Sequence, residues 1–584
     1  MAISLGLGLD QTRLQYGVGG GFRPASLLGY AAHYRADRVT AEPLFSDDFS
    51  DGDASDWSVD IGTITVDAGE LQINGTNAVV TQDVSVADSV YTWDETYAGD
   101  VGGFVFRHTD NTDTLRVYYN GTTIWAQQLN GGSVLSSTSS TSTSGVTYAY
   151  RSVLFGDAWR IYKDDVLLFD ITLDATKYAA MSGTKFGPRT SDAGANRWDN
   201  IAVRTVDPAV DLQWAADTFA QGDTALAGET TPTGGYTWTG SGLSITSNEV
   251  HPTTAGTNSR SYIDWGASDL DMTITFDVGA MDASNDRVGM TYRHTSTTSA
   301  WNCWYAGDDN VILEKYDTTP SSVVTTAVTA LVADTVHELR AIVVGDDHRI
   351  LLDGVVVCEY TDALNNTETN HGLYARGSPE TDIHIQTFTA SAPPLVPCWP
   401  DISGEGLHVT QADLTKAPLL LPKVTDGLKP AVVFNAATFT HLQNDAVVLT
   451  QPASGCLYYE YADPVSFIMD GSVSGSPGRI IIRSGDLNPQ LFAGLYALST
   501  TTPSIGEQIR VSWLADNAAS KYRIDTTTDT GLAAGAWNMA GLTIGTDYAG
   551  TGAPYTGHVA ELILWDADHS DRFGEIDAYL EYWE

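Results

Sequence analysis

The feature of this sequence that most constrains its fold is an internal repeat. Three short segments recur further along the chain in the same order: residues 48–53, 103–109 and 159–169 return as 218–223, 288–295 and 348–358. The offset between matching positions grows along the chain, as expected when loops change length while strands persist. The chain therefore contains two homologous domains in tandem.

Both copies have the pattern of antiparallel β-structure. Residues 115–119 and 301–305 are alternating, aromatic-rich runs bounded by Gly, Asn and Asp, which is typical of short strands. The dipeptide Asp353-Gly354 separates two apolar runs, and a type I′ hairpin turn needs the positive φ angles that such residues tolerate. We expect each copy to be a sandwich of two antiparallel sheets.

The charge balance excludes several classes of partner. The 584 residues include 30 Lys and Arg against 73 Asp and Glu, a formal net charge of −43. Nucleic acids and anionic membranes are bound through Lys and Arg, so neither is expected as a partner. No apolar run approaches the roughly 18 residues of a membrane span, and the first residues lack the basic start of a secretory signal. We expect no membrane insertion.

A different pattern begins after the Pro-containing segment 390–394. Residues 399–406 form a turn-rich opening, and 509–513 alternate like a half-exposed strand. Residues 570–583 place four apolar side chains on one helical face behind Ser570, a favourable N-cap. We expect a third sheet domain that is closed by a short C-terminal helix.

Motifs of this third domain resemble a known family. Segments 399–406, 429–435 and 557–565 look like the opening and last strand of the concanavalin A-like (LamG-like) jelly-roll domains common in bacteriophage tail and virion-surface proteins. Such domains open with a strand of the type found at 31–37, close upstream of the Trp-x-Asp turn that begins at Trp399. In this chain the strand and the turn lie far apart.

The resemblance therefore implies a discontinuous outer jelly roll. It is built from residues 23–41 and 395–584, and the two tandem sandwiches, 44–206 and 214–391, are inserted into one of its loops. Loop closure permits this, because its entropic cost grows only logarithmically with length. The alternative is that residues 34–37 belong to a linker. The expected fold is all-β, with three antiparallel jelly-roll sandwiches.

The two inserted copies are similar to the same class. Their resemblance rests on the opening at 47–57 and the closing segment 198–203, from which the second copy departs at 383–388. A feature that depends on Asp199 is therefore not expected to repeat in the second copy.

The resemblance also implies a location and a function. It indicates a tail fibre, spike or head fibre on the virion surface, which presents jelly rolls to host-surface glycans and assembles as a homo-oligomer. The Gly-rich residues 1–22 are expected to attach the chain to other virion proteins, with a disordered tail as the alternative. A purely structural virion component that binds no sugar is the second hypothesis, and a polysaccharide depolymerase is the third.

Aromatic residues supply the candidates for sugar contact. The chain has 15 Trp and 27 Tyr, more than the expected cores need, and sugars stack on aromatic faces. Trp125, Trp301 and Trp304 are the candidates, and core packing is the alternative for each.

A cluster of aspartates near the start of the first copy is a candidate calcium site. Closely spaced carboxylates supply the oxygen ligands that Ca²⁺ prefers, and Asp48, Asp51 and Asp53 lie together in one turn-rich segment. The family resemblance adds Asp199, which would join the first and last strands through a structural Ca²⁺. The alternative is a solvated acidic turn.

Catalytic motifs are missing from the sequence. It contains no phosphate-binding loop, no zinc-protease motif, no serine-hydrolase elbow and no paired-carboxylate strand of jelly-roll glycosidases. The nearest carboxylate pairs are Glu359 with Asp362 and Glu575 with Asp577, and neither has the strand placement that glycosidases need. We therefore expect no enzymatic activity. The repeated Arg-His pairs at 107–108 and 293–294 are interpreted as inherited strand ends rather than ligand sites.

Overall fold

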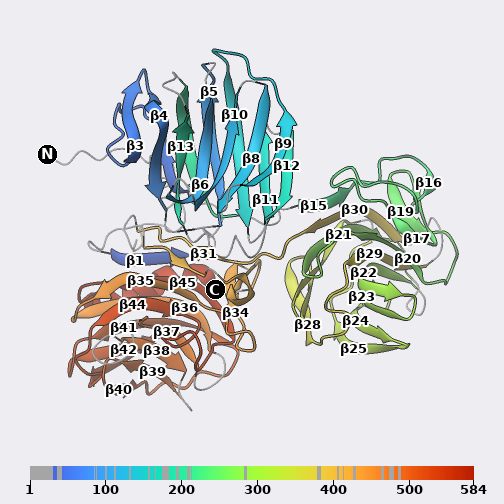
Figure 1. Cartoon of the computed structure of the whole chain (residues 1–584). Coiled ribbons are helices and arrows are strands. Elements are labelled where there is room, and N and C mark those ends of the chain that lie inside the picture. The colour runs from blue at the N-terminus through green and yellow to red at the C-terminus, as the bar shows by residue number, and fades with distance from the viewer. Residues whose placement is uncertain are drawn as a thin grey trace.

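The chain folds almost entirely into antiparallel sheets, as predicted. A computed structural model describes residues 30–35 and 43–584 apart from short internal gaps, the longest at 174–182 and 473–478. All strand pairs among these residues are antiparallel, and the strands build three sandwiches (Figure 1). No helix in the described part of the chain is long and apolar enough to cross a membrane. The expected attachment segment 1–22 lies outside the described residues.

The outer sandwich consists of two sheets. The first contains, in spatial order, β33 (Leu419–Leu421), β34 (Ala431–Phe434), β45 (Gly557–Trp565), β36 (Ala453–Tyr461), β41 (Glu507–Ala515), β42 (Ser520–Ile524) and β43 (Thr527–Leu532). The second contains β31 (Cys398–Trp399), β32 (Val409–Thr410), β35 (Leu442–Leu449), β44 (Met539–Ile544), β37 (Phe467–Asp470), β38 (Ile481–Ser484), β39 (Pro489–Phe492) and β40 (Tyr496–Leu498).

Strand β1 (Tyr30–Arg35) joins the first of these sheets by pairing with β45. The register places Tyr30 opposite Trp565, and Figure 1 shows β1 in blue beside the orange and red strands. Tyr34 is fully buried, and its hydroxyl donates a 2.6 Å hydrogen bond to the carbonyl of Leu407. One sheet therefore combines residues that precede the tandem copies with residues that follow them, as an insertion of 44–391 requires.

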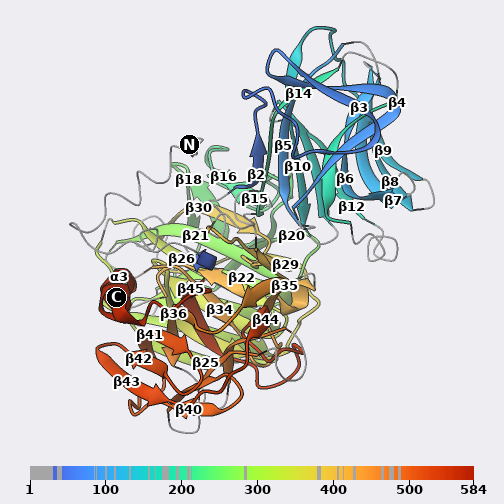
Figure 2. The same ribbon diagram turned by 90° about the vertical axis from the view of Figure 1, so that its left-hand side faces the viewer.

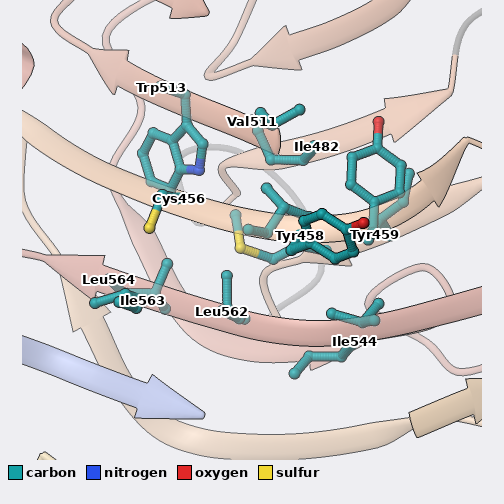
Figure 3. Close-up of a cluster of buried hydrophobic side chains, with 14 of the residues drawn as sticks. Cys456, Tyr458, Tyr459, Ile482, Val511, Trp513, Ile544, Leu562, Ile563 and Leu564 are labelled. Carbon is teal, nitrogen blue, oxygen red and sulfur yellow. The ribbon is translucent and has the colours of Figure 1, made fainter. Parts of the chain in front are cut away.

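The core between these sheets is aliphatic and aromatic. Figure 3 shows Val511 and Trp513 of β41 together with Leu562 and Leu564 of β45 among these buried side chains. Cys456 is a free thiol, like the other three cysteines of the chain, and all four are buried. Thiols in such surroundings contribute to the core as small apolar side chains.

The C-terminal helix closes this sandwich. Helix α3 (Phe573–Leu580) packs against β41 and β36 near the C-terminus (Figure 2), and it buries Phe573, Ile576 and Leu580 as predicted. Beyond α3, the indole Nε1 of Trp583 donates to the buried carboxylate of Glu561 at 2.5 Å. The C-terminal segment therefore makes apolar contacts with β41 and β36 through α3, and a polar contact with β45 through Trp583.

The predicted N-cap at Ser570 is wrong. Residues Ser570–Arg572 form a 3₁₀ turn, and α3 begins after them without a side-chain cap. The Ser570 hydroxyl instead accepts a hydrogen bond from Lys521 Nζ at 2.7 Å, and the Ser570 backbone N–H donates to Asp568 Oδ1 at 2.8 Å.

The second tandem copy is a sandwich of separate sheets. A nine-stranded sheet contains β16 (Thr224–Ala225), β18 (Leu243–Thr246), β19 (Glu249–Pro252), β30 (Ile383–Ser391), β21 (Leu270–Val278), β26 (His337–Val344), β27 (Asp347–Leu352) and β28 (Val355–Thr361), with β15 (Gln213–Asp217) paired to β30. A seven-stranded sheet contains β17 (Thr239–Ser241), β20 (Ser259–Asp264), β29 (Asn370–Arg376), β22 (Arg287–Ser296), β23 (Ser299–Ala306), β24 (Asn310–Asp317) and β25 (Thr319–Ala327). The predicted Asp353-Gly354 turn joins β27 to β28, with φ angles of 51° and 82°.

The strands of the first copy are joined into one 13-stranded sheet. In spatial order it contains β12 (Val166–Thr172), β11 (Ala158–Lys163), β10 (Thr147–Phe155), β5 (Val90–Thr96), β14 (Arg197–Arg204), β4 (Glu70–Asp83), β13 (Lys185–Thr190), β6 (Gly102–Asp110), β7 (Asp113–Tyr119), β8 (Thr123–Asn130) and β9 (Ser133–Ser139). Strands β2 (Pro43–Asp47) and β3 (Ser58–Asp67) pair with β14 and β4. The long strand β4 passes from one layer of the sandwich to the other.

The three sandwiches share apolar contacts. In β31, Cys398 packs into the core of the first copy, whereas the next residue, Trp399, packs into the core of the outer sandwich. On the other side, Ile342 of the second copy lies in one cluster with Leu419 and Leu421 of the outer sandwich. Burial of these side chains resists separation of the domains.

The role of β1 in the outer sandwich is open to a direct test. We expect the substitution Tyr34→Ala to lower the free energy of unfolding of the outer sandwich by about 3–5 kcal/mol, because it removes a buried ring and its hydrogen bond. Urea unfolding combined with hydrogen exchange of β36 and β45 measures this effect. Ile505→Ala, at a side chain that is 70% exposed, serves as the control. Unchanged exchange in β45 after Tyr34→Ala would show that residues 30–35 are only a linker.

Buried histidines make the second copy sensitive to acid. His371 is fully buried; its Nδ1 accepts from the Arg293 backbone N–H, and its Nε2 faces the Ala267 carbonyl at 2.9 Å. Burial lowers the pKa of His371 to about 3 and that of His348 to about 4, against 6.5 for an ordinary histidine. As pH falls below 6.5, the unfolded chain therefore binds protons that the folded chain does not bind.

We expect the second copy to lose stability between about pH 6.5 and pH 4, by roughly 1.4 kcal/mol per pH unit for each of these histidines. Urea unfolding at pH 7.5, 5.5 and 4.5 measures the slope. His371→Gln, which does not titrate, should give a shallower slope, and an equal slope would contradict the assignment.

Candidate functional site

The second copy carries an organised group of side chains on the seven-stranded sheet, on the face directed away from the core. Tyr374 of β29, Gly289 of β22 and Trp304 of β23 lie directly opposite one another in one row across three strands. The two rings stack over the glycine, with centroids 5.1 Å apart and an interplanar angle of 28°. A Cβ atom at Gly289 would lie 2.0 Å from the carbonyl oxygen of Cys303. Because Gly289 has no side chain, the rings of Tyr374 and Trp304, on the two strands that flank β22, come into contact.

Polar side chains surround this ring pair. The guanidinium of Arg260 lies 5.2 Å above the Tyr374 ring, and its Nε donates to Asn302 Oδ1 at 3.2 Å. The amide of Asn302 donates in turn to the carboxylate of Glu314 at 3.2 Å. Arg287 covers the Trp304 ring at 4.9 Å. We call these six residues, Arg260, Arg287, Asn302, Trp304, Glu314 and Tyr374, the second-copy face.

Glu314 is the acidic member of this face. Burial raises the pKa of its carboxyl group, and the hydrogen bond from Asn302 and the charges of Arg287 and Arg260 act against that rise. The two arginines thus balance a buried carboxylate, and the face keeps an excess of N–H donors.

The first copy repeats this arrangement with different residues. Arg189 of β13, Gly103 of β6 and Tyr118 of β7 form the corresponding row. Tyr118 stacks on Trp125 of β8 at 4.8 Å and 14°, and both rings remain partly exposed. With Arg116 and Gln127, the residues Tyr118, Trp125 and Arg189 form what we call the first-copy face.

Two arginines give the first-copy face its charge. Arg116 lies 5.0 Å above the Tyr118 ring and donates from Nε to Gln127 Oε1 at 2.7 Å. Burial and, to a smaller extent, the nearby charge of Arg116 together lower the pKa of Arg189 to about 10. Within the described residues, neither Arg116 nor Arg189 forms an ion pair with a carboxylate. A buried cation such as Arg189 favours an anionic ligand where no carboxylate neutralises it.

The structure separates the three predicted tryptophans. Trp125 lies on the first-copy face with part of its ring exposed. Trp304 lies on the corresponding face of the second copy, but it is 1% exposed because Arg287 and Tyr374 cover it. Trp301 is wrong as a sugar contact, because it is fully buried against His348 and donates from Nε1 to the Leu364 carbonyl.

The predicted calcium residues do not converge. Among the described residues, the one group of three or more His, Cys, Asp and Glu ligands close enough to hold a metal lies elsewhere. Asp48, Asp51 and Asp53 instead each accept a hydrogen bond from the backbone N–H two residues on. Asp199 accepts from the N–H of Asn200. Turn formation therefore accounts for this acidic sequence, and it gives the calcium prediction no three-carboxylate set.

Structural roles also account for the other polar candidates. Glu359 pairs with Arg349 at 2.9 Å, and Asp362 pairs with Lys315 at 2.5 Å. The pair on the C-terminal helix is likewise neutralised, Glu575 by Arg572 and Asp577 by Arg510 and Arg523.

The repeated Arg-His pairs mark strand irregularities. Arg107 and Arg293 have φ angles of 47° and 48°, and their side chains bind Asp88 and Asp269. Arg293 has no exposed side-chain surface, which agrees with the interpretation of these pairs as inherited strand ends.

Sequence reasoning missed most members of both faces. The alternation of side chains along the strands 115–119 and 301–305 could have identified some of them. If Leu115 and Trp301 point inward, then Arg116 and Asn302 point outward. Arg189 and Arg260 come from strands far away in sequence, and only the sheet register brings them to these faces.

Comparisons with known proteins give likenesses to solved structures only. No protein-family model and no curated protein sequence matches the chain. A carbohydrate-binding module, CBM66, from Bacillus subtilis is 17% identical, with a TM-score of 0.23, covering 26% of this chain and 96% of its own. A Bacillus subtilis protein of unknown function with a galectin-like fold is 13% identical, with a TM-score of 0.24, covering 28% of this chain and 97% of its own. A laminarinase from Flavobacterium sp. UMI-01 is 8% identical, with a TM-score of 0.24, covering 28% of this chain and 100% of its own. None of these likenesses is close enough to indicate a shared function.

The glycine in each row is open to mutation. We expect Gly289→Ala to lower the free energy of unfolding of the second copy by about 1–3 kcal/mol, because the new Cβ overlaps the neighbouring strand. Gly574→Ala is the control: a Cβ there meets nothing within 4 Å, so a helical alanine should be neutral or slightly stabilising. Urea unfolding measures both variants, and equal effects would contradict the role assigned to Gly289.

Proposed function

We propose that this chain binds glycans that carry carboxylate or sulfate groups, and that the first-copy face is the main contact surface. The observation that carries the proposal is the partly exposed Tyr118–Trp125 stack beside Arg116 and Arg189, two arginines that form no ion pair with a carboxylate among the described residues. Aromatic faces accept the apolar side of a sugar ring, and Arg and Gln supply hydrogen bonds to its polar groups. The second-copy face offers a similar set with its rings covered.

The local charge of this face argues for an anionic ligand. The chain as a whole carries a net charge of −43, so long-range repulsion slows its approach to acidic polymers. Arg116 and Arg189 place two positive charges at the first-copy face. Binding that occurs there in spite of the net charge is selective for a ligand that fits the face.

We further propose, from the resemblance of segments 399–406 and 557–565, that the chain works at the surface of a phage particle. In this setting it is a tail fibre, spike or head fibre that recognises host-surface glycans as a homo-oligomer, attached through residues 1–22. A virion component that braces the particle without binding sugar is the second candidate. It is favoured by the covered rings of Trp304 and Tyr374 on the second-copy face.

A binding screen tests the proposal. The purified chain is assayed against acidic and neutral polysaccharides, with Ca²⁺ or EDTA, and the same wells are assayed for new reducing ends. We expect binding to acidic members that weakens with salt, no release of reducing ends, and at least a tenfold loss of affinity for Trp125→Ala, which is about 1.4 kcal/mol. Tyr496→Ala, at a ring that is 51% exposed on the outer sandwich, is the matched control.

Each other outcome changes the conclusion. Release of reducing ends would show that the chain is a depolymerase. No binding to any polysaccharide of the panel would favour the role as a virion component that binds no sugar. Equal losses for Trp125→Ala and Tyr496→Ala would place any binding site elsewhere.

A further inference from the structure

The nine-stranded sheet of the second copy holds a group of histidine and carboxylate side chains on its outer face. His251 of β19, His384 of β30 and Asp277 of β21 lie across three adjacent strands, and Glu249 precedes His251 on the same face by two residues. One ligand atom from each of Glu249, Asp277 and His384 lies within 4.8 Å of the others. Ligands of a divalent ion converge in this manner.

The contacts inside this group are short. His384 Nδ1 is 2.7 Å from Asp277 Oδ1 and 3.6 Å from Glu249 Oε2. The Asp277 oxygen is buried and takes part in no hydrogen bond, although Asp277 Oδ2 accepts from Gln386 at 2.8 Å. The rings of His251 and His384 are 4.9 Å apart. The acceptor atoms therefore point toward a common place rather than toward separate donors.

The first copy supplies an internal comparison. The two-residue hairpin that precedes Glu70 corresponds to the one that precedes Glu249, and the sheet register then aligns the other three positions. Gln72 takes the place of His251, Arg197 that of His384 and Thr96 that of Asp277.

In the first copy a side chain provides the positive charge. The guanidinium of Arg197 pairs with Glu70 at 3.2 Å and with Asp67 at 2.8 Å, and the Thr96 hydroxyl donates to Glu70 at 3.3 Å. Arg197 thus neutralises Glu70, which corresponds to Glu249 of the second copy.

In the second copy, His384 stands where the first copy has Arg197, and Asp277 adds a carboxylate where the first copy has Thr96. Within the described residues, the ion pairs of Glu249 and Asp277 involve histidines alone, with no Lys or Arg. Two carboxylates that are partly removed from water are costly unless a positive charge lies between them.

We propose that His384, Asp277 and Glu249 bind a divalent transition-metal ion of the Zn²⁺ class, with His251 beside the site. Imidazole nitrogen with two carboxylate oxygens is a donor set that suits zinc, whereas Ca²⁺ takes six to eight oxygen ligands. The ion fastens β19, β21 and β30 together from outside the core, as Arg197 fastens β4 and β14 in the first copy. This inference is independent of the proposed glycan binding.

Metal titration of the full chain tests the proposal. After removal of metals by a chelator, ZnCl₂ is titrated in a calorimeter and the thermal midpoint is followed with Zn²⁺ or Ca²⁺. We expect one zinc ion per chain, a rise of the midpoint with Zn²⁺ only, and affinity at least 100-fold weaker in the double variant His384→Arg with Asp277→Thr. His337→Arg, at a histidine of the same sheet that pairs with Asp353, is the matched control and should bind as the unmodified chain does.

A reciprocal variant covers the case in which the double variant does not fold. Gln72→His, Thr96→Asp and Arg197→His install the second-copy residues in the first copy, and we expect two zinc ions per chain. The proposal is overturned if the unmodified chain binds zinc no more tightly than the double variant, or if the reciprocal variant still binds one ion.

Discussion

The outer sandwich depends on the edge of β45. Backbone N–H and C=O groups that are buried away from water need hydrogen-bond partners, and β45 is buried along nearly its whole length. On one side, β36 supplies hydrogen-bond partners for the backbone of β45. On the other side, β34 pairs with only the first three residues of β45, and β1 pairs with Glu561–Trp565. Six residues from the start of the described chain thus complete a sheet whose other strands follow the two tandem copies.

Duplication followed by divergence explains the two functional faces. Gly103 and Gly289 keep the same place in each copy, since a Cβ at either position would overlap the neighbouring strand. The side chains on both sides of the glycine then differ: Arg189 and Tyr118 in one copy, Tyr374 and Trp304 in the other. The backbone requirement was thereby kept while the chemistry of the surface changed. The same separation between fixed backbone and variable side chains underlies the contrast between Arg197 and His384.

Much of the fold, and less of the site, could be predicted from the sequence. The repeat, the strand composition and the turn at Asp353-Gly354 act over short distances, so the all-β fold followed from them. The error at Trp301 came from counting aromatic residues without applying the period of two, which separates inward from outward positions along a strand. The aspartates at 48–53 suggested a metal by composition, yet short backbone hydrogen bonds account for them. Glu249, Asp277 and His384 lie on strands far apart in sequence, and a register shift of one residue would send a side chain to the other face. Such a group of side chains cannot be predicted before the pairing of the strands is known.

The pairing of β1 with β45 also sets an order of events during synthesis. Ribosomes make residues 30–35 before both inserted sandwiches and residues 557–565 after them, at about 5–20 residues per second. Both inserted sandwiches contain all their own strands and are complete before β45 exists. They can therefore fold before β45 is available to pair with β1. Strand β1 is made before both sandwiches but pairs with β45 after them, so the outer sandwich closes around domains that are already formed.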